Sequence, residues 1–144
     1  MARGFSLQAD PRNTEYRTFV IASQAYTIGD LVDVSRTAAD VVPSTSSSVT
    51  YGVRGVAMET KLSTDTSLLV ALANADQRWT ADTTNVANAA HNGQRMILTD
   101  QRTVNNTGTD STTSSGVFEQ LGTVGQTNAN RIVGRILATA TITA

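Results

Sequence analysis

The chain lacks cysteine altogether and has a single histidine, and these two scarcities exclude much of thiol and metal chemistry. Without cysteine there is no disulfide, no thiolate nucleophile and no Cys-based zinc site. The histidine, His91, lies between Ala90 and Asn92 beside a predicted turn, and no Gly-x-Ser-x-Gly context occurs anywhere in the chain. We therefore expect His91 to make a hydrogen bond in a loop rather than to act in catalysis.

Cofactor-binding motifs are missing as well. No EF-hand loop, Gly-x-Gly-x-x-Gly, Walker loop or His-Glu-x-x-His pattern can be written from these residues. The acidic residues fall in predicted turns or at strand ends, where they are expected to be solvated rather than paired for acid–base catalysis. We expect no metal, no cofactor and no enzymatic activity. The acidic residues considered are Asp65, Asp76, Asp82, Asp100, Asp110, Glu15, Glu59 and Glu119.

Charge is scarce too, at 16% of the 144 residues with a formal net charge of −1. A globular chain usually carries about a quarter of charged residues. The near-neutral balance argues against a nucleic-acid partner, which needs a basic field, and against a polybasic membrane-surface protein. The 23 threonines and 12 serines predict a surface rich in hydroxyl groups.

Long apolar runs are also absent. The first ten residues contain no run of signal-peptide length, and nothing elsewhere approaches the ~20 residues needed to span a bilayer. We therefore expect a soluble protein. The 40% of hydrophobic residues and the chain length fit one domain with its own core.

Short runs of β-branched and aromatic residues separated by turn formers are what the chain does contain, and they are typical of an all-β domain. Residues 68–73 also suit a helix, but the run is only six apolar residues long and we favour a strand. In residues 49–58 the apolar parity changes, which predicts a β-bulge near Gly55. The other predicted strands are 17–21, 31–35 with Val32 and Val34 on one face, 78–81, 95–99, 117–121 and 131–143 with Ile132 and Ile136 on one face and Arg131 and Arg135 on the other.

The predicted connections follow from glycine, proline, asparagine and serine positions. Residues 74–76 are expected to turn the chain into a hairpin that points Trp79 inward, and Asn92-Gly93 predicts a tight turn. Further turns or loops are predicted at 26–30, 41–48, 82–90 (a loop or a single helical turn) and 105–116, a long polar loop expected to be exposed.

Residues 1–15 show no periodic apolar face, so we expect an extended N-terminal arm followed by a small β-barrel or compact β-sandwich over residues 16–144. The arm is either disordered, as termini often are, or docked on a partner. Its candidate partner-binding residues are Arg3, Phe5, Leu7 and Arg12. If they bind a partner, deleting residues 1–12 should weaken attachment and leave the fold intact.

Arginine outnumbers lysine by ten to one. The planar guanidinium bonds two acceptors at once and suits protein interfaces, although a bias in codon usage explains the same count. The few large aromatic residues are either core groups, which we favour, or a platform for stacking sugars. The aromatic residues in question are Trp79, Tyr16, Tyr26 and Tyr51.

Five segments taken in order resemble the small β-barrel decoration, or cement, proteins of tailed-phage capsids: residues 26–32, 52–57, 69–79, 92–98 and 132–137. The resemblance lies in the residue types of these segments and in their order, and it covers most of residues 16–143. The arm and the 105–116 loop depart from the shortest members of that family. It implies a protein made in the host cytoplasm that binds the major capsid protein on the outer surface of the virion, as a homotrimer or homodimer, and stabilises the shell.

Two alternatives belong to other classes. The first is a carbohydrate- or receptor-binding module of a phage head fibre or tail, which would use Trp79 or the 105–116 loop. The second is a hydrolase built around His91, which ranks last because no further catalytic group accompanies it.

Overall fold

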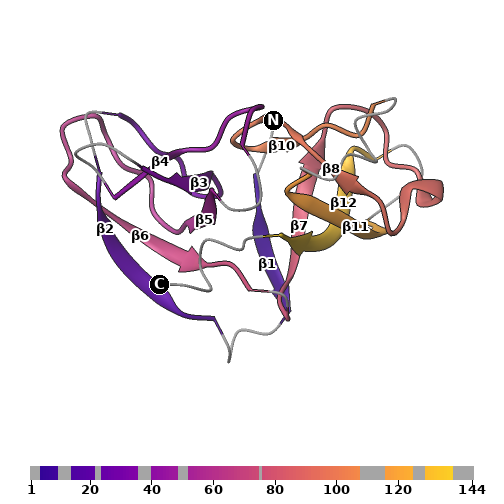
Figure 1. Ribbon diagram of the computed structural model, residues 1–144, viewed down its shortest axis with the longest axis horizontal. Coiled ribbons are helices and arrows are strands. Elements are labelled where there is room, and N and C mark those ends of the chain that lie inside the picture. The colour runs from indigo at the N-terminus through magenta and orange to yellow at the C-terminus, as the bar shows by residue number, and fades with distance from the viewer. Residues whose placement is uncertain are drawn as a thin grey trace.

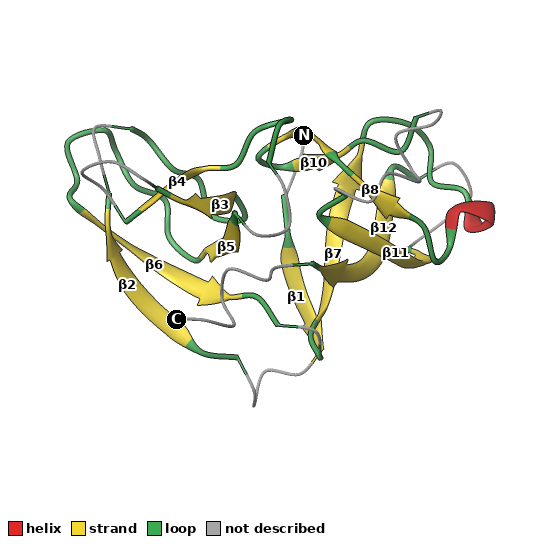
Figure 2. Cartoon of the chain, in the orientation of Figure 1, coloured by secondary structure: helices red, strands yellow, loops and turns green. Residues whose placement is uncertain are grey.

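The structure is a computed structural model that describes residues 4–9, 14–21, 24–35, 40–48, 52–74, 76–107, 116–124 and 129–137. These residues contain twelve β-strands and one turn of 3-10 helix. The all-β class is confirmed, and Figure 2 shows the strands in yellow with the single 3-10 turn in red. The strands are β1 (Ser6–Ala9), β2 (Tyr16–Val20), β3 (Leu31–Val34), β4 (Val41–Pro43), β5 (Val53–Ala57), β6 (Ser67–Leu72), β7 (Arg78–Thr83), β8 (Arg95–Met96), β9 (Leu98–Asp100), β10 (Thr103–Val104), β11 (Phe118–Thr123) and β12 (Arg131–Ile136).

Five of these strands curl into a small barrel, on the left in Figure 1. Their order is β2-β6-β5-β3-β4 with antiparallel neighbours, and a parallel bridge between Ile21 and Val41 brings the first strand against the last. Alternate side chains point inward and fill the barrel, as the alternation of the sequence requires. The interior consists of Phe19, Ile21, Tyr26, Val32, Val41, Ala57, Leu68, Val70 and Leu72.

The bulge predicted near Gly55 is confirmed. Asp33 of β3 lies opposite Val53 and Val32 lies opposite Gly55, so Arg54 is the extra residue on β5. A Cβ atom at Gly55 would stand 2.1 Å from the carbonyl oxygen of Ala71, which explains why glycine occupies this position of the barrel wall. The bulge bends β5 and so helps the sheet to close.

The second sheet, on the right in Figure 1, has the order β8-β11-β12-β7-β10-β9. Strand β7 lies at the centre of this sheet. Strand β12 pairs with one edge of β7, and β1 and β10 pair with successive stretches of its other edge. Its burial alternates residue by residue, with Trp79 and Ala81 fully buried, as a strand with one face on the core predicts.

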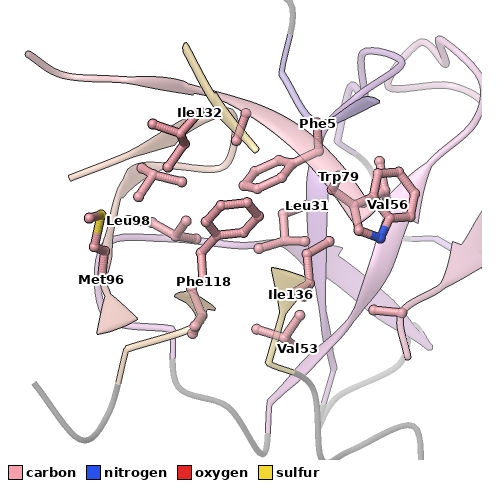
Figure 3. Close-up of a cluster of buried hydrophobic side chains, with 14 of the residues drawn as sticks. Phe5, Leu31, Val53, Val56, Trp79, Met96, Leu98, Phe118, Ile132 and Ile136 are labelled. Carbon is pink, nitrogen blue, oxygen red and sulfur yellow. The ribbon is translucent and has the colours of Figure 1, made fainter. Parts of the chain in front are cut away.

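A second core lies between this sheet and the outer wall of the barrel (Figure 3). Both faces of the barrel wall are therefore buried at β3, where Leu31 enters the second core and Val32 the barrel interior. Strand β3 is thus buried on both faces where it begins, while Val34, predicted to share the face of Val32, is only partly buried. The second core contains Phe5, Leu31, Val53, Val56, Ala71, Ala73, Trp79, Ala81, Met96, Leu98, Val104, Val117, Phe118, Ile132 and Ile136.

The structure agrees with the sequence on local features but not on which strands pair. The strand over 68–73, the inward Trp79 and the turn at Asn92-Gly93 are confirmed, the last with Gly93 at a φ of 88°. The hairpin expected around 74–76 is wrong, because β6 belongs to the barrel and β7 to the second sheet. The chain between them crosses from one sheet to the other.

Three further expectations are corrected. Residues 41–48 begin with strand β4, which tolerates Pro43 because the proline is its last residue. The predicted strand 95–99 is broken into β8 and β9. Asn106, expected in an exposed loop, is buried and bonds to the backbone of residues 85 and 86; positions 108–115 and 138–144 lie outside the described residues.

Within the described part of the chain, no helix has the length and apolarity that crossing a membrane requires.

Candidate functional site

The N-terminal segment was the predicted partner-binding site, and the structure places its apolar residues against the chain's own core. Phe5 is 2% exposed and meets the ring of Phe118 edge-on, with 5.7 Å between ring centroids, and Figure 3 shows the two rings next to each other in the core. Leu7 is partly buried on the same core and pairs with Trp79 through β1. Residues 6–9 are thus a strand of the second sheet rather than part of a projecting arm.

This placement changes the expected effect of removing the segment. Deleting residues 1–12 would take Phe5 out of the second core and β1 out of the second sheet, so we expect it to destabilise that sheet rather than leave the fold unaffected. Arg3 and Arg12 lie outside the described residues. A role of the four residues in binding a partner stays a prediction, and Phe5 is available for it only if the segment leaves the core.

Gly4 holds the segment in place through its backbone. Its φ is +71°, its N–H donates to Oδ2 of Asp82 at 2.9 Å, and a Cβ atom would stand 2.5 Å from the carbonyl oxygen of Gly29. The next N–H, that of Phe5, donates to the same Gly29 oxygen at 2.9 Å. The segment therefore connects the second sheet with a turn of the barrel.

Arg131 and Asp82 form a buried ion pair, with side chains 9% and 15% exposed. Arg131 is 7% exposed, although its strand parity predicted a side chain on the face opposite Ile132 and Ile136. Its Nη1 donates to Oδ1 of Asp82 at 2.7 Å and to the Gly4 oxygen at 3.3 Å, and its Nη2 donates to Oγ1 of Thr80 at 2.6 Å. The side chain does face away from the core, but residues 4–6 cover it. Because these guanidinium donors bond to Gly4, Asp82 and Thr80, the ion pair holds the N-terminal segment against the second sheet.

A second ion pair links the barrel to the second sheet. Asp30 is 2% exposed, and its Oδ1 accepts from Nη1 of Arg102 at 2.6 Å while its Oδ2 accepts from the Thr27 N–H at 2.9 Å. One residue away, the Leu31 N–H donates to the Gln101 oxygen at 2.8 Å. The two sheets are therefore joined by polar contacts as well as by the shared core.

Asp33 is a half-buried acidic residue that the sequence analysis did not single out. Its Oδ1 accepts from the hydroxyl of Ser44 at 2.6 Å and its Oδ2 from the hydroxyl of Ser48. Burial raises the pKa of Asp33, and the two hydroxyl donors offset part of that rise. The Ser48 oxygen also accepts from the Thr45 N–H at 2.9 Å, so the cluster folds the chain after β4. A serine-rich stretch beside a strand bearing an aspartate was the available signal.

His91 lies in the 3-10 turn Ala89–His91 and is placed by backbone bonds. Its N–H donates to the Asn88 oxygen at 3.0 Å and its oxygen accepts from the Gln94 N–H at 3.0 Å. Across the described ranges, no group of three or more histidine and acidic side chains is arranged to hold a metal ion.

The aromatic residues separate into core and surface. Trp79 and Tyr26 are 0% and 1% exposed, which confirms the core role that we favoured for them. Nε1 of Trp79 donates to Oε1 of Gln77 at 3.0 Å, and the Tyr26 hydroxyl donates to the Val41 oxygen at 3.2 Å. Tyr16 is 48% exposed, and Tyr51 lies outside the described residues. A sugar-stacking platform that includes Trp79 is incompatible with this burial.

Comparison with known proteins adds no assignment: no protein-family model matches the chain, and no curated protein matches its sequence significantly.

Proposed function

We propose that this chain is a viral structural protein that binds the outer surface of a tailed-phage capsid and stabilises the shell. Its partners are the major capsid protein and further copies of itself, as a homotrimer or homodimer. It acts through shape and contact, without catalysis, after synthesis in the host cytoplasm. The resemblance of its segments to capsid decoration proteins suggested this role, and the all-β fold is compatible with it.

The observation that carries the proposal is the second core, to which the barrel wall, the second sheet and Phe5 all contribute. A brace must transmit force between the subunits that it bridges, so its parts must not move independently. The Arg131–Asp82 and Arg102–Asp30 pairs add bonds at the junctions of the same three parts. The molecule is thereby built as one stiff unit.

Repetition supplies the strength that such a brace needs. A small domain offers a modest interface, but copies linked to one another bind the shell multivalently, which raises the effective affinity without any catalytic group. Pairing of strands in a barrel also limits the open edges through which crowded copies would aggregate.

The test is binding to expanded shells of the phage whose genome encodes this chain. We expect the purified protein to sediment with the shells, to appear as regular density on their outer surface by electron microscopy, and to raise the temperature at which they break. Protein that stays in the supernatant at saturating concentration would refute the proposal. Binding to purified host glycans instead would favour the receptor-binding alternative.

A further inference from the structure

The outward face of the second sheet carries a row of arginines across neighbouring strands. Met96 and Phe118 point into the core, so the adjacent Arg95 and Glu119 point away from it. The strand register places Arg95 opposite Glu119, and Glu119 opposite Arg135. Three charged side chains thus stand side by side on β8, β11 and β12.

A fourth position extends the row onto β7. The pairing of β12 with β7 ends at Gly134 opposite Trp79. Continuing the antiparallel register by one position aligns Arg135 with Arg78. Trp79 points into the core, which turns Arg78 to the outward face. We call Arg78, Arg95 and Arg135 the arginine row. With strands about 4.8 Å apart, the row spans about 14 Å from β8 to β7.

The row is accessible and carries excess positive charge. Arg95 is exposed, the Arg135 side chain is 35% exposed, and Arg78, half-buried, donates from Nη1 to the Gln77 oxygen at 3.0 Å. The carboxylate of Glu119, 17% exposed, pairs with Arg135. Arg95 stands outside that ion pair, so β8, β11 and β12 present two cations against one anion here, on a chain whose formal net charge is −1.

Apolar groups lie beside the row. Val133, two positions from Arg135 on the same face of β12, is half-buried, and Leu121 at the bulge of β11 is 39% exposed. Arginine mixed with apolar side chains, and with little lysine, is the composition of the buried part of protein interfaces. The arginine bias of the sequence is thus concentrated, in part, on one face.

We propose that the arginine row is the face by which the protein docks on an acidic surface of the capsid protein, with carboxylates of the partner bonded to the guanidinium groups. This inference rests on the proposed function and names the surface that it uses. The planar guanidinium bonds a carboxylate through two parallel N–H groups, which fixes orientation as well as contact.

A protein partner fits the row better than nucleic acid does. Binding to a duplex draws its strength from many neutralised phosphates, whereas three arginines span only about 14 Å here and Glu119 interrupts them. A partner surface with a few placed carboxylates matches both the short length and the mixed sign of the row.

The experiment compares two double variants in the shell sedimentation assay over a range of salt concentrations. Arg95→Gln with Arg135→Gln removes two charges from the row, and Arg17→Gln with Lys61→Gln removes two from the barrel as a matched control. Melting curves establish that both variants fold. Arg95→Gln alone, which leaves the Glu119–Arg135 pair intact, is the third variant and covers the case in which the double variant unfolds.

We expect shell affinity to fall about tenfold or more in the row variant, with a weaker dependence on salt, and to change less than about twofold in the control. The single Arg95 variant should show a smaller loss of the same kind. If the wild type binds shells and the row variants bind equally well, the docking face is wrong while the proposed function stands. If the wild type does not bind, both fall.

A second arm measures binding of the wild type to a short DNA duplex at physiological salt. We expect none that depends on the row. Tight duplex binding that disappears in the Arg95→Gln, Arg135→Gln variant would assign the row to nucleic acid and overturn the protein partner.

Discussion

The barrel and the second sheet solve the problem of burying apolar surface in different ways. The barrel encloses its interior with its own five strands, and the Ile21–Val41 bridge completes the enclosure. The second sheet has no such closure. Its apolar face is covered by the outer wall of the barrel, through residues such as Leu31 and Val53, and by Phe5 from the N-terminal segment.

This difference separates a self-contained part of the fold from a dependent one. Removing a contact at the junction should loosen the second sheet first, because its core loses a wall, whereas the barrel keeps its interior. The arginine row lies on the dependent part, so the stability of the junction also sets the geometry of the proposed docking face. Four measurements test this comparison.

The largest effect is expected from Phe5→Ala, which empties a fully enclosed position of the shared core. Truncation of a buried phenylalanine costs about 3–5 kcal/mol of unfolding free energy, measurable by urea denaturation. Hydrogen exchange should speed up in β11 and β12 more than in β5 and β6. Equal acceleration in the four strands would show that the two regions unfold as one and would remove the distinction.

Asp82→Ala tests the polar half of the junction. It leaves the Arg131 guanidinium, 9% exposed, without its carboxylate, and we expect a loss of about 3 kcal/mol because a buried unpaired charge is costly. The exposed pair Arg17–Glu15, with side chains 45% and 59% exposed, is the matched control, and Glu15→Ala should cost at most about 1 kcal/mol. Similar losses at the two sites would mean that the Asp82 pair contributes no more than a surface contact.

Tyr26→Phe examines the barrel alone. It removes the hydroxyl that donates to the Val41 oxygen and should cost about 1 kcal/mol, the net value of one hydrogen bond. Because the ring still fills the barrel, amide hydrogen exchange in β11 and β12 should be as slow as in the wild type. Any faster exchange should occur in barrel strands such as β5. Faster exchange confined to the second sheet would contradict the independence of the barrel interior.

The smallest effect is expected at Asp33, through pH. Its raised folded-state pKa means that the native protein binds the proton more tightly than the unfolded chain does, so the stability contribution of Asp33 is full below the ordinary aspartate pKa and is lost as pH rises through the folded value. Stability of the wild type relative to Asp33→Asn should therefore fall over that window and level off above it. A relative gain with rising pH would show that the hydroxyl bonds outweigh burial.

The predictions from sequence failed where distant residues decide the outcome. Arg131 lies on the outward parity, as its strand position predicts, yet it is buried because residues 4–6 fold over it. Phe5 stands in a stretch without periodicity, so no local pattern marked it as a core residue. Asp33 alternates with Val32 and Val34 along its strand, but the two hydroxyl groups that bond its carboxylate belong to serines 11 and 15 positions away.

The arginine row was visible in the sequence only as a count. Ten arginines against one lysine predicted an interface without locating it. Arg78, Arg95 and Arg135 are far apart along the chain, and only the register of β8, β11, β12 and β7 aligns them.

By itself the sequence determined the all-β class, the bulge at Gly55, the turn at Asn92-Gly93 and the inward Trp79, because alternation, glycine and turn chemistry act over a few neighbouring residues. Only the tertiary structure decided that β6 and β7 belong to different sheets, that Phe5 completes the shared core and that Arg131 is covered. Those outcomes depend on the free energy of contacts between segments distant in the chain, which no local pattern encodes.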